Sequence, residues 1–153
     1  MPSLEALTSP GLIFPDLEAA DAAGVLRELA ARLAERGPVR DPEGLYQRLW
    51  EREQLGSTAI GNGVAIPHCK LDHLERVLVA VAVAPRGVDF GAGDGKPVRL
   101  FFAVVSPSRA PAEHLQSLAA ISRWVKSGGD VEGLIAGHDP EAIYRTIRGE
   151  AGH

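Results

Sequence analysis

The sequence has little cysteine, no long apolar run and no excess of positive charge. One cysteine among 153 residues excludes an intrachain disulfide, as is usual in a reducing compartment. No run of about 18 apolar residues occurs, which predicts that no segment spans a membrane. Residues 1–15 lack the basic and apolar segments of a signal peptide. The net charge of −4 argues against nucleic acid or an anionic membrane as a partner. We therefore expect a cytoplasmic protein without membrane insertion.

The chain also lacks internal repeats, low-complexity tracts and an interdomain linker. A length of 153 residues is enough for one well-filled core and too short for two ordinary domains. Hydrophobic residues at 45% and charged residues at 24% are normal for a globular protein. The sequence therefore predicts one domain, followed by a loose tail at residues 148–153.

Capping residues predict where the helices begin. Aspartates at typical N-cap positions are Asp21, Asp41, Asp130 and Asp139. The helix after Asp21 has apolar residues at helical spacing and ends at Gly37-Pro38. Pro42 and Glu43 suit the first turn of the second helix. A further helix is predicted from Pro111 to about Lys126.

Four apolar segments are candidate strands. Residues 12–14 form a short one, and Val64-Ala65-Ile66 forms another that Pro67 should end, because proline has no N–H for a ladder. Residues 77–84 are an almost unbroken apolar run that predicts a buried strand, broken by Pro85-Arg86-Gly87. Residues 98–105 predict another. The last two strands can pair as an antiparallel hairpin, although the sequence does not fix their pairing.

His68 directly follows the strand at residues 64–66. A histidine at the end of a strand is fixed by its backbone yet open to solvent, which suits a group that must meet another macromolecule. Ser57 and Thr58 bring hydroxyl donors to the preceding turn, while Gly61 and Gly63 allow positive φ or close backbone approach. Taken alone, His68 is also compatible with an ordinary surface or capping histidine.

Two more residues are candidates for an anion site. Arg52 projects from the same helical stripe as Leu45 and Leu49, either as an arginine that bends to the surface or as a guanidinium held near His68 to meet a phosphate. His114 lies in the first turn of the helix that begins at Pro111, where free N–H groups favour an anion. We expect it on the margin of a buried stripe. The members of that stripe are Leu115, Leu118, Ala119, Ser122 and Val125.

Neighbouring residues suggest other sites only weakly. Cys69 should point to the opposite face from His68, as a small packing residue. His68, Cys69 and His73 match no common zinc spacing. Gly61-Asn62-Gly63 is not a dinucleotide-binding fingerprint, because no third glycine follows and the turn precedes a strand. We therefore expect neither a metal nor a cofactor.

Residues 52–70 resemble the signature of the fructose/mannitol-type (type 2) enzyme IIA domains of the bacterial sugar phosphotransferase system. The matching segments are Arg52-Glu53, Gly56-Ser57-Thr58, Gly61-Asn62-Gly63, Ala65-Ile66-Pro67-His68 and, downstream, His114-Leu115. The resemblance extends over residues 4–147, and Asn62 makes it strongest to the nitrogen-regulatory type, since mannitol-type relatives tend to have an acid nearby. It implies a single α/β domain, with a mixed sheet of about four to six strands and helices on both faces.

The resemblance also implies a function. His68 would accept a phosphoryl group at Nε2 from HPr or a nitrogen-branch HPr homologue. His114 would hydrogen-bond the phosphate, and Arg52, Ser57 and Thr58 would orient the ring or neutralise charge. The output would be regulation through phosphorylation-dependent binding of target proteins.

Three alternatives remain open from the sequence. The phosphate could pass to an enzyme IIB of a fructose-type permease, which we expect to be a separate chain. The chain could be a binding module that takes no phosphate, or a metal-dependent hydrolase.

Overall fold

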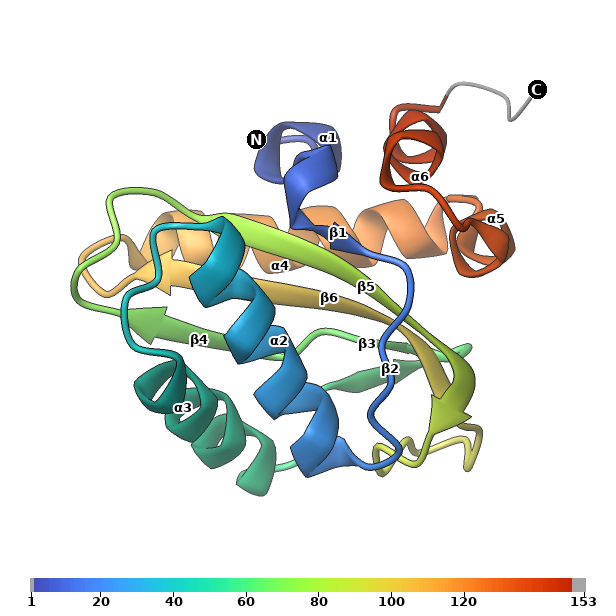
Figure 1. Ribbon diagram of the computed structural model, residues 1–153. Coiled ribbons are helices and arrows are strands. Elements are labelled where there is room, and N and C mark those ends of the chain that lie inside the picture. The colour runs from blue at the N-terminus through green and yellow to red at the C-terminus, as the bar shows by residue number, and fades with distance from the viewer. Residues whose placement is uncertain (1, 150–153) are drawn as a thin grey trace.

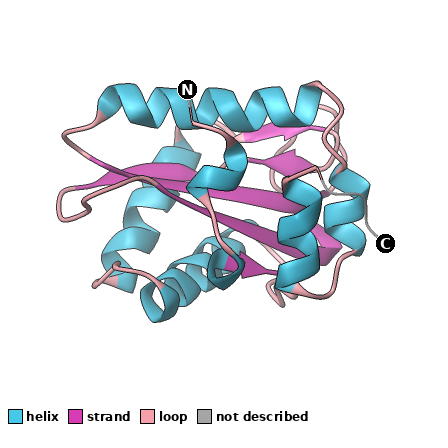
Figure 2. Cartoon of the chain, turned by 90° about the horizontal axis from the view of Figure 1, so that it is seen from above, coloured by secondary structure: helices cyan, strands magenta, loops and turns pink. Residues whose placement is uncertain are grey.

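A six-stranded mixed sheet lies between two layers of helices (Figures 1 and 2). The computed structural model describes residues 2–149. On one face of the sheet lie α2 and α3, and on the other lie α4 and the shorter α1, α5 and α6. This confirms the predicted α/β class. The helices are α1 (Leu4–Leu7), the 3-10 helix η1 (Pro10–Leu12), α2 (Ala22–Arg36), α3 (Pro42–Gln54), α4 (Pro111–Lys126), α5 (Val131–Ala136) and α6 (Pro140–Ile147). The strands are β1 (Ile13–Phe14), β2 (Ala59–Gly61), β3 (Val64–Ala65), β4 (His68–Leu71), β5 (Leu78–Val88) and β6 (Val98–Pro107).

The long strands β5 and β6 form the centre of the sheet. They pair antiparallel, from Leu78 opposite Val105 to Val83 opposite Leu100, so the hairpin that the sequence allowed is confirmed. On one side β1 pairs parallel with β5. On the other side β3 and β4 both pair parallel with β6, and β2 pairs with β3. Residues of β5 and β6 alternate between the two cores, which explains why their sequences are apolar throughout.

The predicted break at Pro85-Arg86-Gly87 is wrong, because β5 continues to Val88. The ladder with β6 shifts register between Val83 and Val88, and Gly87 has φ of 79°. An irregularity of this kind accommodates a residue without an N–H, so the proline bends the strand without ending it.

The segment that leads to His68 also differs from the prediction. A tight turn at Gly61, Asn62 and Gly63, all at positive φ, leads into β3, which ends at Ala65. After Pro67 a new strand, β4, begins at His68, whereas the sequence predicted only that a strand stops there. Both strands keep one register on β6, with Ala65 opposite Phe101 and His68 opposite Val104. Pro67 fits because its carbonyl accepts from the N–H of Val104 at 2.9 Å.

Helix α4 has the predicted bounds but buries a different stripe. Leu115 is 66% exposed, and the buried positions are His114, Ser117, Ala120 and Ile121. The predicted stripe is therefore wrong at Leu115 and Ala119, which are exposed, whereas Leu118 and Val125 are partly buried against the core. His114 lies on the buried face itself. Ser117 tolerates burial because its hydroxyl donates to the carbonyl of Glu113, one turn earlier in the helix.

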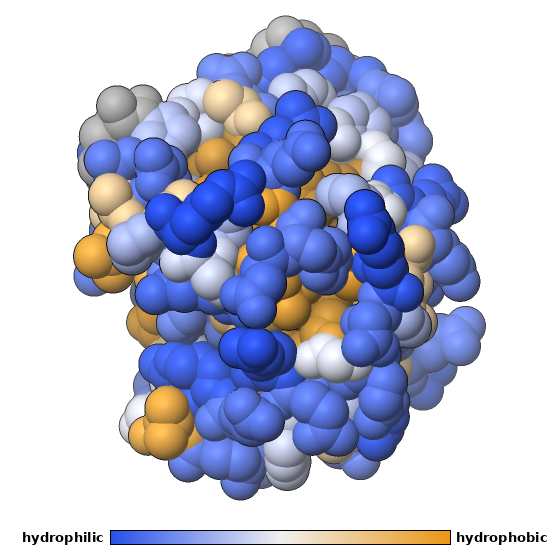
Figure 3. Space-filling model, turned by 90° about the vertical axis from the view of Figure 1, so that its left-hand side faces the viewer, coloured by the Kyte–Doolittle hydropathy of each residue, from blue (hydrophilic) through white to orange (hydrophobic). Residues whose placement is uncertain are grey.

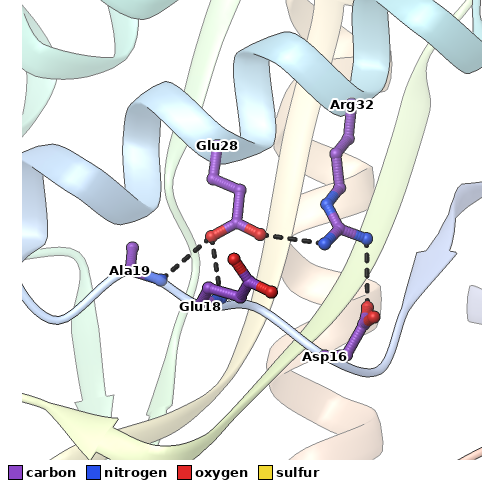
Figure 4. Close-up of polar contacts among 5 residues, drawn as sticks. All are labelled: Asp16, Glu18, Ala19, Glu28 and Arg32. Atoms are coloured by element: carbon purple, nitrogen blue, oxygen red, sulfur yellow. Dashed lines mark hydrogen bonds and ion pairs between the residues drawn. The ribbon is translucent and has the colours of Figure 1, made fainter.

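The chain between β1 and α2 is fastened to α2 by side chains (Figure 4). One carboxylate oxygen of Glu28 accepts from the backbone N–H groups of Glu18 and Ala19, at 2.9 and 3.0 Å. Its other oxygen pairs with Arg32, which also pairs with Asp16. This network satisfies backbone donors of a segment that belongs to no helix or strand.

Figure 3 looks onto the end of the molecule where the β4–β5 and β6–α4 connections lie. Hydrophilic side chains dominate this end, with hydrophobic surface between them near the centre. Arg109 joins the two connections by donating to the carbonyl of Leu74 at 2.7 Å.

At the C-terminal end of the described chain, Arg148 and Gly149 form a turn after α6. The remainder of the predicted tail, residues 150–153, lies outside the described residues. None of the helices in the described part of the chain is long and apolar enough to cross a bilayer.

Candidate functional site

His68 begins the edge strand β4, with its ring half-buried. Nδ1 lies 2.8 Å from the carbonyl oxygen of Ile66. A carbonyl can only accept, so Nδ1 carries the proton in the neutral ring and Nε2 carries the lone pair. The backbone thus prepares Nε2, and not Nδ1, as the nucleophilic nitrogen.

Arg52 reaches that nitrogen from the last turn of α3. Its Nε donates to Nε2 of His68 at 3.3 Å, and its Nη1 donates to the carbonyl of Gly56 at 3.0 Å. The guanidinium is thereby fixed between the histidine and the backbone that follows α3. The sequence left open whether Arg52 bends to the surface or is held near His68. The structure has Arg52 in contact with His68.

His114 approaches His68 from α4, which lies on the other face of the sheet from α3, the helix that carries Arg52. The ring centroids lie 5.4 Å apart, and His114 is only 5% exposed. Nδ1 of His114 lies 2.7 Å from the hydroxyl of Ser106. This contact fixes the ring and leaves Nε2 of His114 without a hydrogen-bond partner among residues 2–149.

Burial and nearby positive charge keep both rings neutral. Burial lowers the pKa of His68 below its ordinary 6.5, and Arg52 and Lys70 lower it further, whereas the bond to Ile66 acts in the opposite direction. Burial, His68 and Lys70 lower the pKa of His114 to about 4. At neutral pH the site therefore offers an unprotonated nitrogen beside a guanidinium and an ammonium group, an arrangement that favours attack on an anionic group.

Ser57 and Thr58 lie in the loop after α3, and their hydroxyl groups donate to acceptors other than His68. Ser57 Oγ donates to the carbonyl of Phe90 at 2.6 Å. Thr58 Oγ1 donates to a carboxylate oxygen of Glu53 at 2.8 Å. Their direct contacts therefore hold the loop, and the structure brings together only Arg52 and His114 with His68.

Cys69 lies on the other face of β4 from His68. Its side chain is buried among residues that pack against α2 and α3, as predicted for a packing residue, and burial raises the pKa of its thiol to about 12. Within residues 2–149 no three His, Cys, Asp or Glu side chains are grouped so as to hold a metal ion.

Comparison with known proteins places this chain in a family. Residues 6–149 match the family model described as phosphoenolpyruvate-dependent sugar phosphotransferase system, EIIA 2. The chain belongs to this EIIA type 2 family. A nitrogen regulatory protein of Bradyrhizobium diazoefficiens is 39% identical over 141 residues, which cover 92% of each chain.

Other similar proteins carry either a sugar-specific or a nitrogen-regulatory name. A fructose-specific EIIA component of Haloferax volcanii is 34% identical over 124 residues, covering 81% of this chain and 80% of that one. The crystal structure of nitrogen regulatory protein IIA-Ntr from Neisseria meningitidis superimposes with a TM-score of 0.84 at 27% identity, covering 94% of this chain and 98% of that chain. The EIIA fold and the resemblance to the nitrogen-regulatory type are thus confirmed.

Sequence reasoning missed two residues at this site, Ser106 and Lys70, and assigned no role to a third, Glu53. Ser106 orients His114 from β6, and no sequence signal indicated it, because the contact joins a strand to a helix. Lys70 follows His68 by two residues on the same strand, so strand periodicity would have placed it on the same face. Glu53 belongs to the recognised signature, and only the structure shows what it binds.

Proposed function

We propose that the protein is a phosphohistidine carrier that accepts a phosphoryl group on Nε2 of His68 from HPr or a nitrogen-branch HPr homologue. The observation that carries this proposal is the pair of contacts at His68, in which Ile66 fixes the proton on Nδ1 and Arg52 lies at Nε2. Membership of the EIIA type 2 family supports the same assignment.

The transfer is a displacement at phosphorus. The Nε2 lone pair of His68 forms a new N–P bond as the N–P bond of the donor phosphohistidine breaks, and the electron pair of that bond returns to the leaving imidazole. Positive charge develops on the His68 ring as the new bond forms. The Nδ1–H bond to the Ile66 carbonyl stabilises that charge.

The surrounding side chains act on the transferred group. Arg52 donates N–H groups to the phosphoryl oxygens once they take the place of its present contact with Nε2. His114, neutral and held by Ser106, places Nε2 where it can hydrogen-bond the phosphate. Ser57 and Thr58 orient the ring indirectly, by holding the loop that contacts Arg52. Positioning and charge stabilisation of this kind supply most of the catalysis in phosphoryl transfer.

The output that we propose is regulatory, through target proteins that bind according to phosphorylation state. The relatives named as nitrogen regulatory proteins support it. A second candidate is phosphoryl delivery to an enzyme IIB of a fructose-type permease, which the fructose-specific relative favours.

Intact-mass measurement after incubation with phosphoenolpyruvate, enzyme I and HPr tests the proposal. The wild type should gain one phosphoryl group, His68→Ala should gain none, and His114→Ala should gain it more slowly. No gain by the wild type with a cognate HPr would reject the carrier and leave a binding module with this fold. Transfer onward to a purified enzyme IIB would favour the permease output.

A further inference from the structure

Glu53 makes two hydrogen bonds to a single residue five positions later. Its Oε2 accepts from the backbone N–H of Thr58 and its Oε1 accepts from the Thr58 hydroxyl, each at 2.8 Å. Thr58 is only 6% exposed. The carboxylate therefore closes the chain between the end of α3 and the start of β2 into a fixed loop.

The carbonyl that holds Arg52 lies inside this loop. Gly56 accepts from Nη1 of Arg52 at 3.0 Å, and Gly56 has φ of 146°, in a region open to glycine. Next to it, Ser57 anchors the loop to the Phe90 carbonyl. The position of the Gly56 carbonyl, and with it the direction of the guanidinium, depends on how firmly Thr58 is held.

We infer that Glu53 is a positioning residue for phosphoryl transfer, which binds both donors of Thr58 and so holds the Gly56 carbonyl that aims Arg52 at Nε2 of His68. The inference rests on the proposed carrier function and adds to it a residue that touches neither the phosphate nor His68. Burial raises the pKa of Glu53, and the Thr58 bonds and Arg52 oppose that rise. Carboxylates with a perturbed pKa cluster at functional sites, and Glu53 directly follows Arg52 in the chain.

Two substitutions loosen the loop in different ways. Glu53→Gln has the size of the native side chain, but its amide can accept only one of the two bonds, because its nitrogen meets a donor. Thr58→Val keeps the shape and the backbone bond, removes only the hydroxyl and changes no charge. Glu51→Gln is the matched control, since Glu51 is an exposed acid next to Arg52 with no hydrogen bond or ion pair in the described structure. Thr58→Ser restores the hydroxyl.

The pKa of His68, followed by NMR in the unphosphorylated protein, separates positioning from simple loss of charge. Arg52 lowers that pKa. If the loop aims Arg52, freeing the guanidinium in Glu53→Gln and Thr58→Val should raise the pKa of His68. Loss of a negative charge alone would lower it or leave it unchanged. Thr58→Ser should return the pKa of His68 to the wild-type value, and Glu51→Gln should not raise it.

Transfer kinetics complete the test. We expect kcat for phosphoryl transfer from phospho-HPr to fall by about tenfold in Glu53→Gln and in Thr58→Val, with KM for phospho-HPr within about twofold, because the loss is in orientation. An unchanged or lowered pKa of His68 in both variants, or wild-type kcat in both, would overturn the inference. If the wild type takes no phosphate, the carrier function fails, and the NMR titration still reports whether Glu53 positions Arg52.

Discussion

The Nε–H of Arg52 donates to Nε2 of His68 at 3.3 Å. The guanidinium therefore covers the nitrogen that we propose receives the phosphoryl group. Phosphorylation must displace this contact, and the same N–H groups then become available to the phosphoryl oxygens. One arginine thus has a hydrogen-bond partner both before and after transfer.

Arg52→Lys should slow phosphoryl transfer by about 10- to 100-fold, because lysine keeps the charge but loses the planar fork that binds phosphate at two points. Single-turnover transfer from phospho-HPr measures the effect. Arg48→Lys, one helical turn earlier on α3 and exposed, is the matched control and should transfer at the wild-type rate. Equal rates for both variants would contradict the assigned role of Arg52.

The buried state of His114 makes stability depend on pH. Its pKa in the folded protein is about 4, against an ordinary 6.5. Between these values the unfolded chain binds the proton more readily, so stability should fall as pH drops from about 6.5 to 4, by about 1.4 kcal/mol per unit of pKa difference. Urea unfolding at several pH values measures this. The fall should be smaller in His114→Gln, and an NMR titration of His114 with a midpoint near 6.5 would refute the expectation.

The Cys69 thiol should resist modification in the folded protein. With its pKa raised to about 12 by burial, the thiolate fraction at pH 8 is about 10³-fold below that of an exposed cysteine. Reaction with a disulfide reagent such as DTNB should therefore be slow in buffer and fast in denaturant. Rapid labelling of the native protein would show that the thiol is accessible.

Glu28→Ala should reduce the free energy of unfolding by about 1–3 kcal/mol, because it leaves the N–H groups of Glu18 and Ala19 without their acceptor and removes one of the two carboxylate partners of Arg32 (Figure 4). Glu35→Ala, on the same helix but exposed and without a hydrogen bond or ion pair in the described structure, should change it by less than about 0.5 kcal/mol. Chemical denaturation of both variants checks the difference. Equal losses would mean that the network contributes nothing beyond helix propensity.

The helix starts were predictable because an aspartate cap is a local signal. Asp21, Asp41 and Asp130 each accept from the N–H three residues later, and Asp139 accepts from the N–H two residues later. The predictions at Pro67 and Pro85 were less accurate, because the effect of a proline on a strand depends on which backbone groups of the neighbouring strand face it. Pro67 is compatible with its position beside β6 because its carbonyl accepts from the N–H of Val104 and no N–H of its own is required. Pro85 lies at an irregularity of the β5–β6 ladder.

Two buried positions of α4 were missed because His114 and Ser117 are polar. Their burial is possible only because Ser106 and the Glu113 carbonyl provide hydrogen-bond partners, and the contact with Ser106 is set by the packing of α4 on β6. Arg52, His68 and His114 were identified from the family signature. The contact of Ser106 with His114 and the bonds of Glu53 to Thr58 needed the three-dimensional structure.

The position of the phosphoryl group is the measurement to make first. Nitrogen-15 and phosphorus NMR of the protein phosphorylated through enzyme I and HPr identifies the residue and the ring nitrogen that carry the phosphorus. The contacts of His68 predict one phosphoryl group, on Nε2 of His68, with Nδ1 still bonded to the Ile66 carbonyl. Phosphate on Nδ1 of His68, or on His114, would contradict the proposed site.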